Sequence, residues 1–221
     1  MRKIPLSRLA AAAVLAVTMH AQADTGMFPG FANGSQSVNF SLTAPNAVVS
    51  GSASAGGFLM SYNGGLSFEA YCVDVYQHIS FGETYTDYGA PGTSHVFTNS
   101  NAYTDLGRLY ATAGVVNNSV SEAAFQIAVW EIAYETTGGP YNLATGSATF
   151  SGGSADSSGA LTLASSWLAS LTNGAHPSIV VIESSGHQDV IYPPVPEPET
   201  YALMLAGLGA MGFVARRRRR S

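Results

Sequence analysis

The sequence predicts a single α+β domain, in which an antiparallel β-sheet, sandwich or barrel packs against about three helices. Three observations lead to this prediction. Short runs of alternating apolar and polar residues are separated by turn residues, and 24 of the 221 residues are glycine. Only 10% of the residues are charged, as in domains with a turn-rich β surface. Three later segments instead carry apolar residues at helical spacing.

Strands are expected at both ends of the body of the chain. Each is a short run in which apolar and polar residues alternate between Gly, Ser and Asn turns. They are expected at residues 38–42, 47–50 and 66–72, as a pair between 77 and 88, and at 178–182 and 189–192. In segment 66–72, alternation places Cys72 on the same face as Leu66, Phe68 and Ala70, so we expect its thiol to point inward.

Three helices are expected between these strands. Thr104 is suited to cap the first, a short helix. Ser119 and Glu122 have the spacing of a capping box ahead of the second, at residues 120–134. This helix is apolar on nearly all sides, so we expect it at the centre of the core. The third helix is expected at residues 160–172.

The charge distribution excludes several kinds of partner. Arg108 is the only lysine or arginine between residues 24 and 200, because the others lie at the two ends of the chain. The body is therefore acidic and contains no lysine. Such a body offers no attraction to a phosphate backbone or to anionic lipid headgroups, and we expect no nucleic-acid partner.

The N-terminus has the three parts of a secretion signal. Basic residues at positions 2, 3 and 8 flank the start of an apolar run at 9–19, and the small-residue pattern Ala21-Gln22-Ala23 follows. The apolar run is too short to cross a bilayer of ~30 Å at ~1.5 Å per helical residue. We interpret residues 1–23 as a signal peptide, with a single exported domain at residues 24–192.

The C-terminal tail, residues 193–221, also has the form of a sorting signal. Pro196, Glu197 and Pro198 precede an apolar run at 201–215, and five arginines follow. The tail resembles the PEP-CTERM signal, which exosortases recognise in bacteria that make exopolysaccharide. The prolines end any helix before the run, and the arginines hold its far end in the cytoplasm.

The tail resemblance implies a route. The protein would cross the inner membrane, stay anchored there transiently by its C-terminal segment, and meet an exosortase-type processing enzyme in that membrane. It would then reach the cell surface or the extracellular matrix. The alternative is a permanent membrane anchor, for which the apolar run is short.

Two segments of the body place a reactive atom or a polar group in apolar surroundings. One is Tyr71-Cys72-Val73-Asp74, on an expected strand, and the other is Phe125-Gln126-Ile127-Ala128-Val129-Trp130-Glu131, on the expected central helix. Together they resemble the paired motifs of bacterial surface thioester domains, in which a cysteine after an aromatic residue joins a glutamine in a Gln-x-Ala-apolar-Trp stretch. Phe125 departs from the threonine common before that glutamine.

The resemblance implies a thioester between Cys72 and Gln126. The supporting motif residues are Tyr71, Asp74, Ala128, Trp130 and Glu131. The thiolate would attack the side-chain carbonyl of Gln126 and ammonia would leave. An amine or hydroxyl on an extracellular polysaccharide or a surface protein would then displace the thiol. Asp74, His78 and Glu131 are the candidates for proton transfer, although no spacing ties His78 to Cys72 and a surface or turn position is the favoured interpretation for it. The protein would act once rather than turn over as an enzyme.

The alternative is a noncovalent structural protein of the exopolysaccharide or biofilm matrix with the same fold. Gln126 would then be a buried amide satisfied by backbone groups, and Cys72 an inert buried thiol. Cys72 is the only cysteine, so no intramolecular disulfide can form. The histidines show no metal-ligand spacing, and we expect neither a metal site nor a cofactor.

Overall fold

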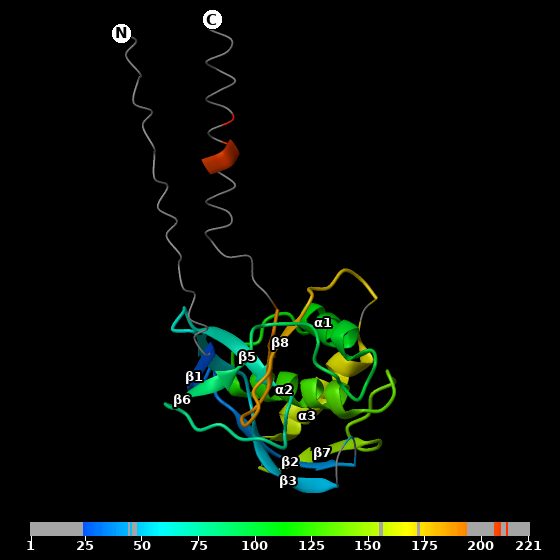
Figure 1. Cartoon of the computed structure of the whole chain (residues 1–221). Helices are drawn as coiled ribbons and strands as arrows, with labels where there is room; N and C mark the ends of the chain where they lie inside the picture. The colour runs from blue at the N-terminus through cyan, green and yellow to red at the C-terminus, as the bar shows by residue number, and fades with distance from the viewer. Residues whose placement is uncertain are drawn as a thin grey trace, which may run out of the picture.

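Two antiparallel sheets and three main helices make up the part of the chain that the structure describes (Figure 1). The structure is a computed structural model, and it describes residues 24–43, 45, 48–154, 157–171, 173–193, 206–208 and 211. One sheet lies at the left of Figure 1 and the other at the bottom, with the helices between and beside them. This architecture confirms the expected α+β domain.

Nine strands form the two sheets. They are β1 (Asp24–Phe31), β2 (Gln36–Leu42), β3 (Val49–Ala55), β4 (Phe58–Tyr62), β5 (Phe68–Cys72), β6 (Thr84–Tyr88), β7 (Ala148–Gly152), β8 (Val180–Ile182) and β9 (Val190–Tyr192). The larger sheet has the order β6-β1-β4-β5-β9-β8, and the smaller one β3-β2-β7. β5 lies inside the larger sheet, where Ala70 pairs with Phe58 of β4 and Cys72 with Val190 of β9.

The strand that carries Cys72 starts later than expected. β5 begins at Phe68, and Leu66, expected on the inward face, is 93% exposed. The cause is the tight turn after β4, in which Asn63 and Gly64 have positive φ, so that Leu66 lies in the connection between the strands. The end of β5 agrees with the expectation, since Cys72 is fully buried.

Two further strand predictions need correction. The pair expected at residues 77–88 is a single strand, β6, which pairs with β1. β7 was not expected, because its five residues Ala-Thr-Phe-Ser-Gly resemble the turn sequences around them. It completes the smaller sheet by pairing with β2.

All three expected helices are present, but the third lies three residues earlier than expected and the caps of the first two differ. They are α1 (Ala102–Ala113), α2 (Ser119–Tyr134) and α3 (Ser157–Ala169). α1 begins after Asn101 rather than at Thr104. α2 is capped by Asn118, whose side chain accepts hydrogen bonds from two backbone N–H groups of the first turn. Glu122, expected in the capping box, is instead buried in the core.

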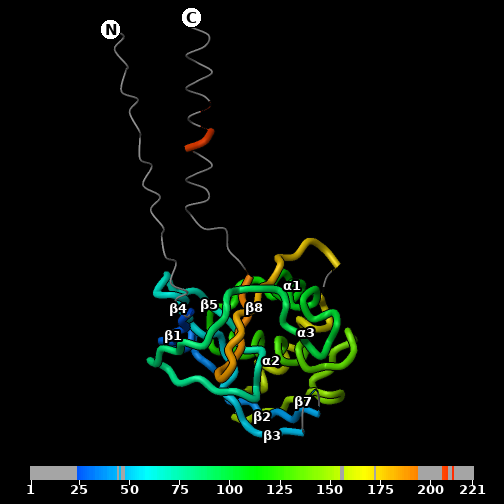
Figure 2. The backbone as a smooth tube through the Cα atoms, viewed as in Figure 1, coloured from blue at the N-terminus to red at the C-terminus, as the bar shows by residue number. Residues whose placement is uncertain are grey.

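α2 lies at the centre of the molecule, as its composition predicts (Figure 2). All of its residues from Ser121 to Tyr134 are buried. The helix packs against α1 and α3 and against strands of both sheets, including β5. A polar side chain on α2 therefore depends on other protein groups for its hydrogen bonds.

Candidate functional site

Cys72 and Gln126 lie side by side in the core. The backbone N–H of Cys72 donates to Gln126 Oε1 at 3.0 Å, and Gln126 Nε2 donates to the carbonyl oxygen of Cys72 at 2.8 Å. Neither residue has any exposed surface. The carboxamide pairs with the end of β5 as a neighbouring strand would, which holds the Gln126 side chain against Cys72.

Residues four apart on α2 hold the end of β5. Glu122 Oε2 accepts a hydrogen bond from the Tyr71 hydroxyl at 2.9 Å, and Gln126 bonds to Cys72, one residue further along β5. Trp130 lies four residues beyond Gln126, and its indole N–H is close enough to lower the pKa of the Cys72 thiol. Residues four apart share one face of a helix. Glu122, Gln126 and Trp130 therefore place three polar groups in a row beside β5.

Aromatic rings close the site against water. The Tyr71 ring lies 4.4 Å from that of Phe125, centroid to centroid, and the Phe125 ring lies 4.7 Å from that of Tyr110. Trp167 of α3 approaches Phe125 edge-on at 6.3 Å. Tyr71 and Phe125 are 2% and 1% exposed, so the surroundings of Cys72 and Gln126 are dry.

The Cys72 thiol is held in its neutral form. The thiol donates to the carbonyl oxygen of Asp74, with the sulfur 3.1 Å from that oxygen. Burial raises the pKa of the thiol well above its ordinary value, and the Trp130 indole offsets part of that rise. Attack by this sulfur therefore requires a group that removes its proton.

Asp74 and His78, two of the candidates for proton transfer, differ in burial and in distance from the thiol. Asp74 follows Cys72 closely, but its carboxylate caps a turn by accepting the backbone N–H of Tyr76 at 2.9 Å. Burial raises the pKa of Asp74, and the Tyr76 N–H and nearby histidines oppose that rise. His78 is exposed. Of the two, Asp74 lies beside the thiol.

Glu131, the third candidate, has no exposed surface. Its Oε1 accepts the backbone N–H of Asn142 at 2.8 Å, and its Oε2 has no partner among the described residues. Burial raises the pKa of Glu131 to about 7; the Asn142 N–H lowers it and Glu135 adds to the rise. The carboxyl group of Glu131 therefore titrates near neutral pH. Its hydrogen bond to Asn142 joins α2 to the connection that leads to β7. Ala128, the remaining motif residue, is fully buried.

Sequence reasoning misses a pair of carboxylates that share the Tyr71 hydroxyl. This hydroxyl contacts both Glu69 Oε1 and Glu122 Oε2, and Glu122 also accepts from Asn33 Nδ2 at 2.5 Å and from the Gly57 N–H at 3.2 Å. Burial raises the pKa of Glu69, the Tyr71 hydrogen bond opposes the rise, and Glu122 adds to it. The available signal was alternation in β5, which places Glu69 and Tyr71 on one face.

A comparison with known families identifies the tail of the chain. The family model described as a PEP-CTERM protein-sorting motif matches residues 194–220. The motif marks an exported protein that an exosortase sorts. The PEP-CTERM motif includes Pro196, Glu197 and Pro198, which confirms the expected sorting signal, although these residues lie outside those that the structure describes. It supports processing by an exosortase in the membrane and transient anchoring by the C-terminus before surface release.

No curated protein and no solved structure matches the chain. The resemblance of residues 66–135 to thioester domains therefore stays a prediction, as do the domain boundaries at residues 24 and 192. The expected signal peptide, residues 1–23, lies outside the described residues. In the part of the chain that the structure describes, no helix has the length and apolar character needed to cross a membrane.

Proposed function

We propose that this protein is an exported surface or matrix protein that attaches covalently to a partner through a thioester between Cys72 and Gln126. One observation carries the proposal. The Gln126 carboxamide is held against Cys72 by two hydrogen bonds, in a place without exposed surface. A thioester needs a sulfur close to an acyl carbon and protection from water. The two hydrogen bonds hold the carboxamide at the residue that carries the sulfur, and burial keeps water away from both.

The bond forms by acyl substitution on the Gln126 side chain. The sulfur of Cys72 adds to Cδ, the bond from Cδ to Nε2 breaks, and the nitrogen leaves as ammonia with the thiol proton. The thiol must release its hydrogen bond to Asp74, and Nε2 must release the carbonyl oxygen of Cys72. The product holds the acyl group of Gln126 on sulfur.

Attachment then consumes the bond. An amine or hydroxyl on an extracellular polysaccharide or surface protein attacks Cδ, forms an amide or ester, and returns the thiol of Cys72. The body contains no lysine, so neighbouring copies offer no side-chain amine as a competing nucleophile. Because Cys72 and Gln126 are fully buried, the incoming group reaches them only when the domain opens locally.

The second candidate is a noncovalent matrix protein with the same fold. One observation favours it: the Gln126 carboxamide is paired at both Oε1 and Nε2, and the Cys72 thiol has the Asp74 carbonyl as its acceptor. Each group is therefore satisfied without a bond between them, and leaving such an amide unpaired costs about 1–3 kcal/mol.

Intact mass of the exported protein distinguishes the two. A thioester makes the chain about 17 Da lighter than its processed sequence, and methylamine then adds about 31 Da, on Gln126, while exposing one thiol. Cys72→Ala and Gln126→Met should each have full mass and ignore methylamine. A full-mass wild type that also ignores methylamine under mild denaturant would overturn the covalent proposal and leave the noncovalent one.

A further inference from the structure

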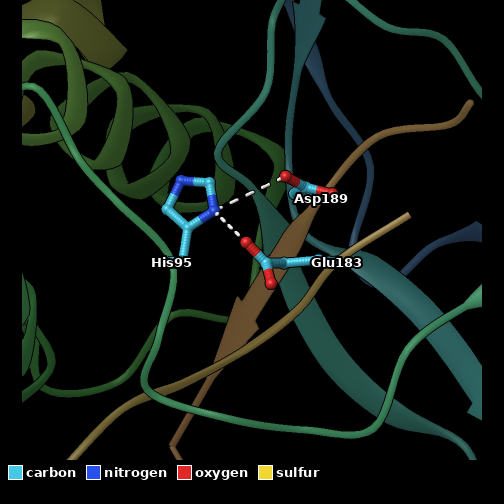
Figure 3. Close-up of side chains that lie close together, drawn as sticks. All are labelled: His95, Glu183 and Asp189. Carbon is cyan, nitrogen blue, oxygen red and sulfur yellow. Dashed lines mark hydrogen bonds and ion pairs between the residues drawn. The ribbon is translucent and has the colours of Figure 1, made fainter. Parts of the chain in front are cut away.

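The imidazole of His95 faces two carboxylates from the β8–β9 connection, both on the side of its Nδ1 (Figure 3). Its Nδ1 lies 2.9 Å from Glu183 Oε1 and 3.6 Å from Asp189 Oδ2. One ligand atom from each of the three residues lies within 4.8 Å of the other two. The side chains of His95 and Asp189 are 19% and 13% exposed, against 50% for Glu183, so the cluster opens to solvent on the Glu183 side.

The three side chains are fixed by groups behind them. Ser184 N–H donates to Asp189 Oδ1 at 2.7 Å, which leaves Oδ2 directed at His95. The His95 ring packs edge-on against Phe97, with centroids 4.5 Å apart. Such outer contacts orient metal ligands in proteins.

The backbone around the cluster is fixed as well. Gly92 and Val181 exchange two backbone hydrogen bonds at 2.9 and 2.8 Å, and Gly89 N–H donates to the Glu183 carbonyl oxygen at 2.7 Å. The segment just before His95 is therefore joined by backbone hydrogen bonds to Val181 and Glu183. Backbone hydrogen bonds therefore bring His95 close to Glu183, independently of any contact between their side chains.

The spacing of the ligand atoms suits a small dication. A zinc ion holds nitrogen and oxygen ligands at ~2.0–2.2 Å, so neighbouring corners of its tetrahedron lie about 3.3–3.6 Å apart. The two separations from His95 Nδ1, 2.9 and 3.6 Å, bracket most of this range. Small rotations of the half-exposed Glu183 side chain are enough to reach it.

The negative charge of the carboxylates beside His95 also favours a bound cation. Two carboxylates, those of Glu183 and Asp189, approach the same nitrogen of His95. Arg108 is the only strong base in the body, and its guanidinium is paired with Asp105 at 2.8 Å. Within residues 24–193 that the structure describes, no lysine or unpaired arginine is therefore available to balance the cluster.

We propose that His95, Glu183 and Asp189 form a binding site for a divalent transition-metal ion, of which zinc fits best. An imidazole nitrogen favours zinc over calcium and magnesium, which prefer oxygen ligands alone. Three protein ligands leave a fourth position for water or for a donor on a partner. Because Val73 N–H bonds to the Asp189 carbonyl oxygen at 2.9 Å, the ion would also brace the chain just after Cys72.

Zinc titration of the exported protein, stripped of metal by a chelator and followed by calorimetry, tests the site. One equivalent of zinc should bind, and Asp189→Asn, Glu183→Gln and His95→Gln should each weaken it at least about tenfold. Cobalt in place of zinc should give the strong visible absorption of a tetrahedral site. His187→Gln is the matched control, since His187 Nδ1 lies 2.9 Å from a single carboxylate, that of Asp87, and should leave zinc affinity unchanged.

Several results would overturn the site. They are absence of zinc binding in the wild type, unchanged affinity in Glu183→Gln, an equal loss in His187→Gln, and calcium binding as tight as zinc binding. Glu183 is half exposed, so its replacement leaves a folded protein even if a change at Asp189 does not. Circular dichroism of each metal-free variant separates loss of binding from loss of the fold.

Discussion

The sulfur of Cys72 can be removed without disturbing the hydrogen bonds that hold Gln126. Those bonds use only the backbone N–H and carbonyl oxygen of residue 72, so they persist in Cys72→Ala. In a noncovalent protein this variant loses one small buried group, which lowers the free energy of unfolding by about 1 kcal/mol. In a protein with the thioester it also loses a crosslink.

The size of the second effect follows from the chain length that the bond encloses. Cys72 and Gln126 are 54 residues apart, and closing a loop of that length in the unfolded chain is worth about 4 kcal/mol at 25 °C by the relation used for disulfides. Cys72→Ala should therefore cost about 5 kcal/mol. Gln126→Met should cost the same 4 kcal/mol plus about 1–3 kcal/mol, because it leaves the buried N–H of Cys72 without its acceptor.

Because either substitution breaks the same bond, their effects should not add. The double variant should cost about 4 kcal/mol less than the sum of the single ones. Urea unfolding at neutral pH, followed by tryptophan fluorescence, measures all three, and methylamine-treated wild type should lose the same 4 kcal/mol without any substitution. Leu66→Ser, at a 93% exposed position, is the control and should change little. Additive costs, with about 1 kcal/mol for Cys72→Ala, would refute the covalent reasoning.

Three further predictions concern the frame of the site. Burial raises the pKa of Glu131 from 4.5 to about 7, so the folded protein binds this proton more tightly than the unfolded chain. Glu131 should therefore contribute a fall of about 3 kcal/mol in the free energy of unfolding as the pH rises from 4.5 through 7, and in urea unfolding across that window Glu131→Gln should fall by that much less than the wild type. Tyr71→Phe should cost about 1–3 kcal/mol, because Glu69 and Glu122 lose their shared donor; an unchanged melting temperature would contradict that role. Asn118→Ala should cost about 1 kcal/mol and Ser119→Ala less, and thermal melts giving the reverse order would contradict the observed cap.

Composition and periodicity predict which helices and strands are buried. Capping and turn residues predict less well where each helix or strand begins. The all-apolar pattern of α2 predicts its central position, and alternation in β5 predicts that Cys72 points inward. The start of α2 is ambiguous from sequence, because Asn118 and Ser119 are both good caps. Glu122 does not close a capping box with Ser119, since it lies in the core and accepts hydrogen bonds from Asn33, Gly57 and Tyr71, which are all distant in sequence.

The pairing of chemical groups is predicted less well, because it depends on contacts between distant segments. The proximity of Cys72 and Gln126 follows from the resemblance of two motifs, and no spacing rule would have produced it. His95 and Glu183 are 88 residues apart and meet only because Gly92 pairs with Val181. The expectation that the histidines bind no metal rested on sequence spacing alone, which carries no information about such a meeting.

The proposed thioester between Cys72 and Gln126 requires the thiol of Cys72 to lose its proton. In the finished core, burial raises the pKa of the thiol, and the Asp74 carboxylate is occupied by the Tyr76 N–H. While β5 is still docking onto α2, water reaches the sulfur and its pKa lies nearer the ordinary value. Once docking is complete, the same burial that opposes deprotonation protects an acyl thioester from hydrolysis. This core is therefore better suited to keeping such a bond than to making it, and a thioester here would form during folding after export.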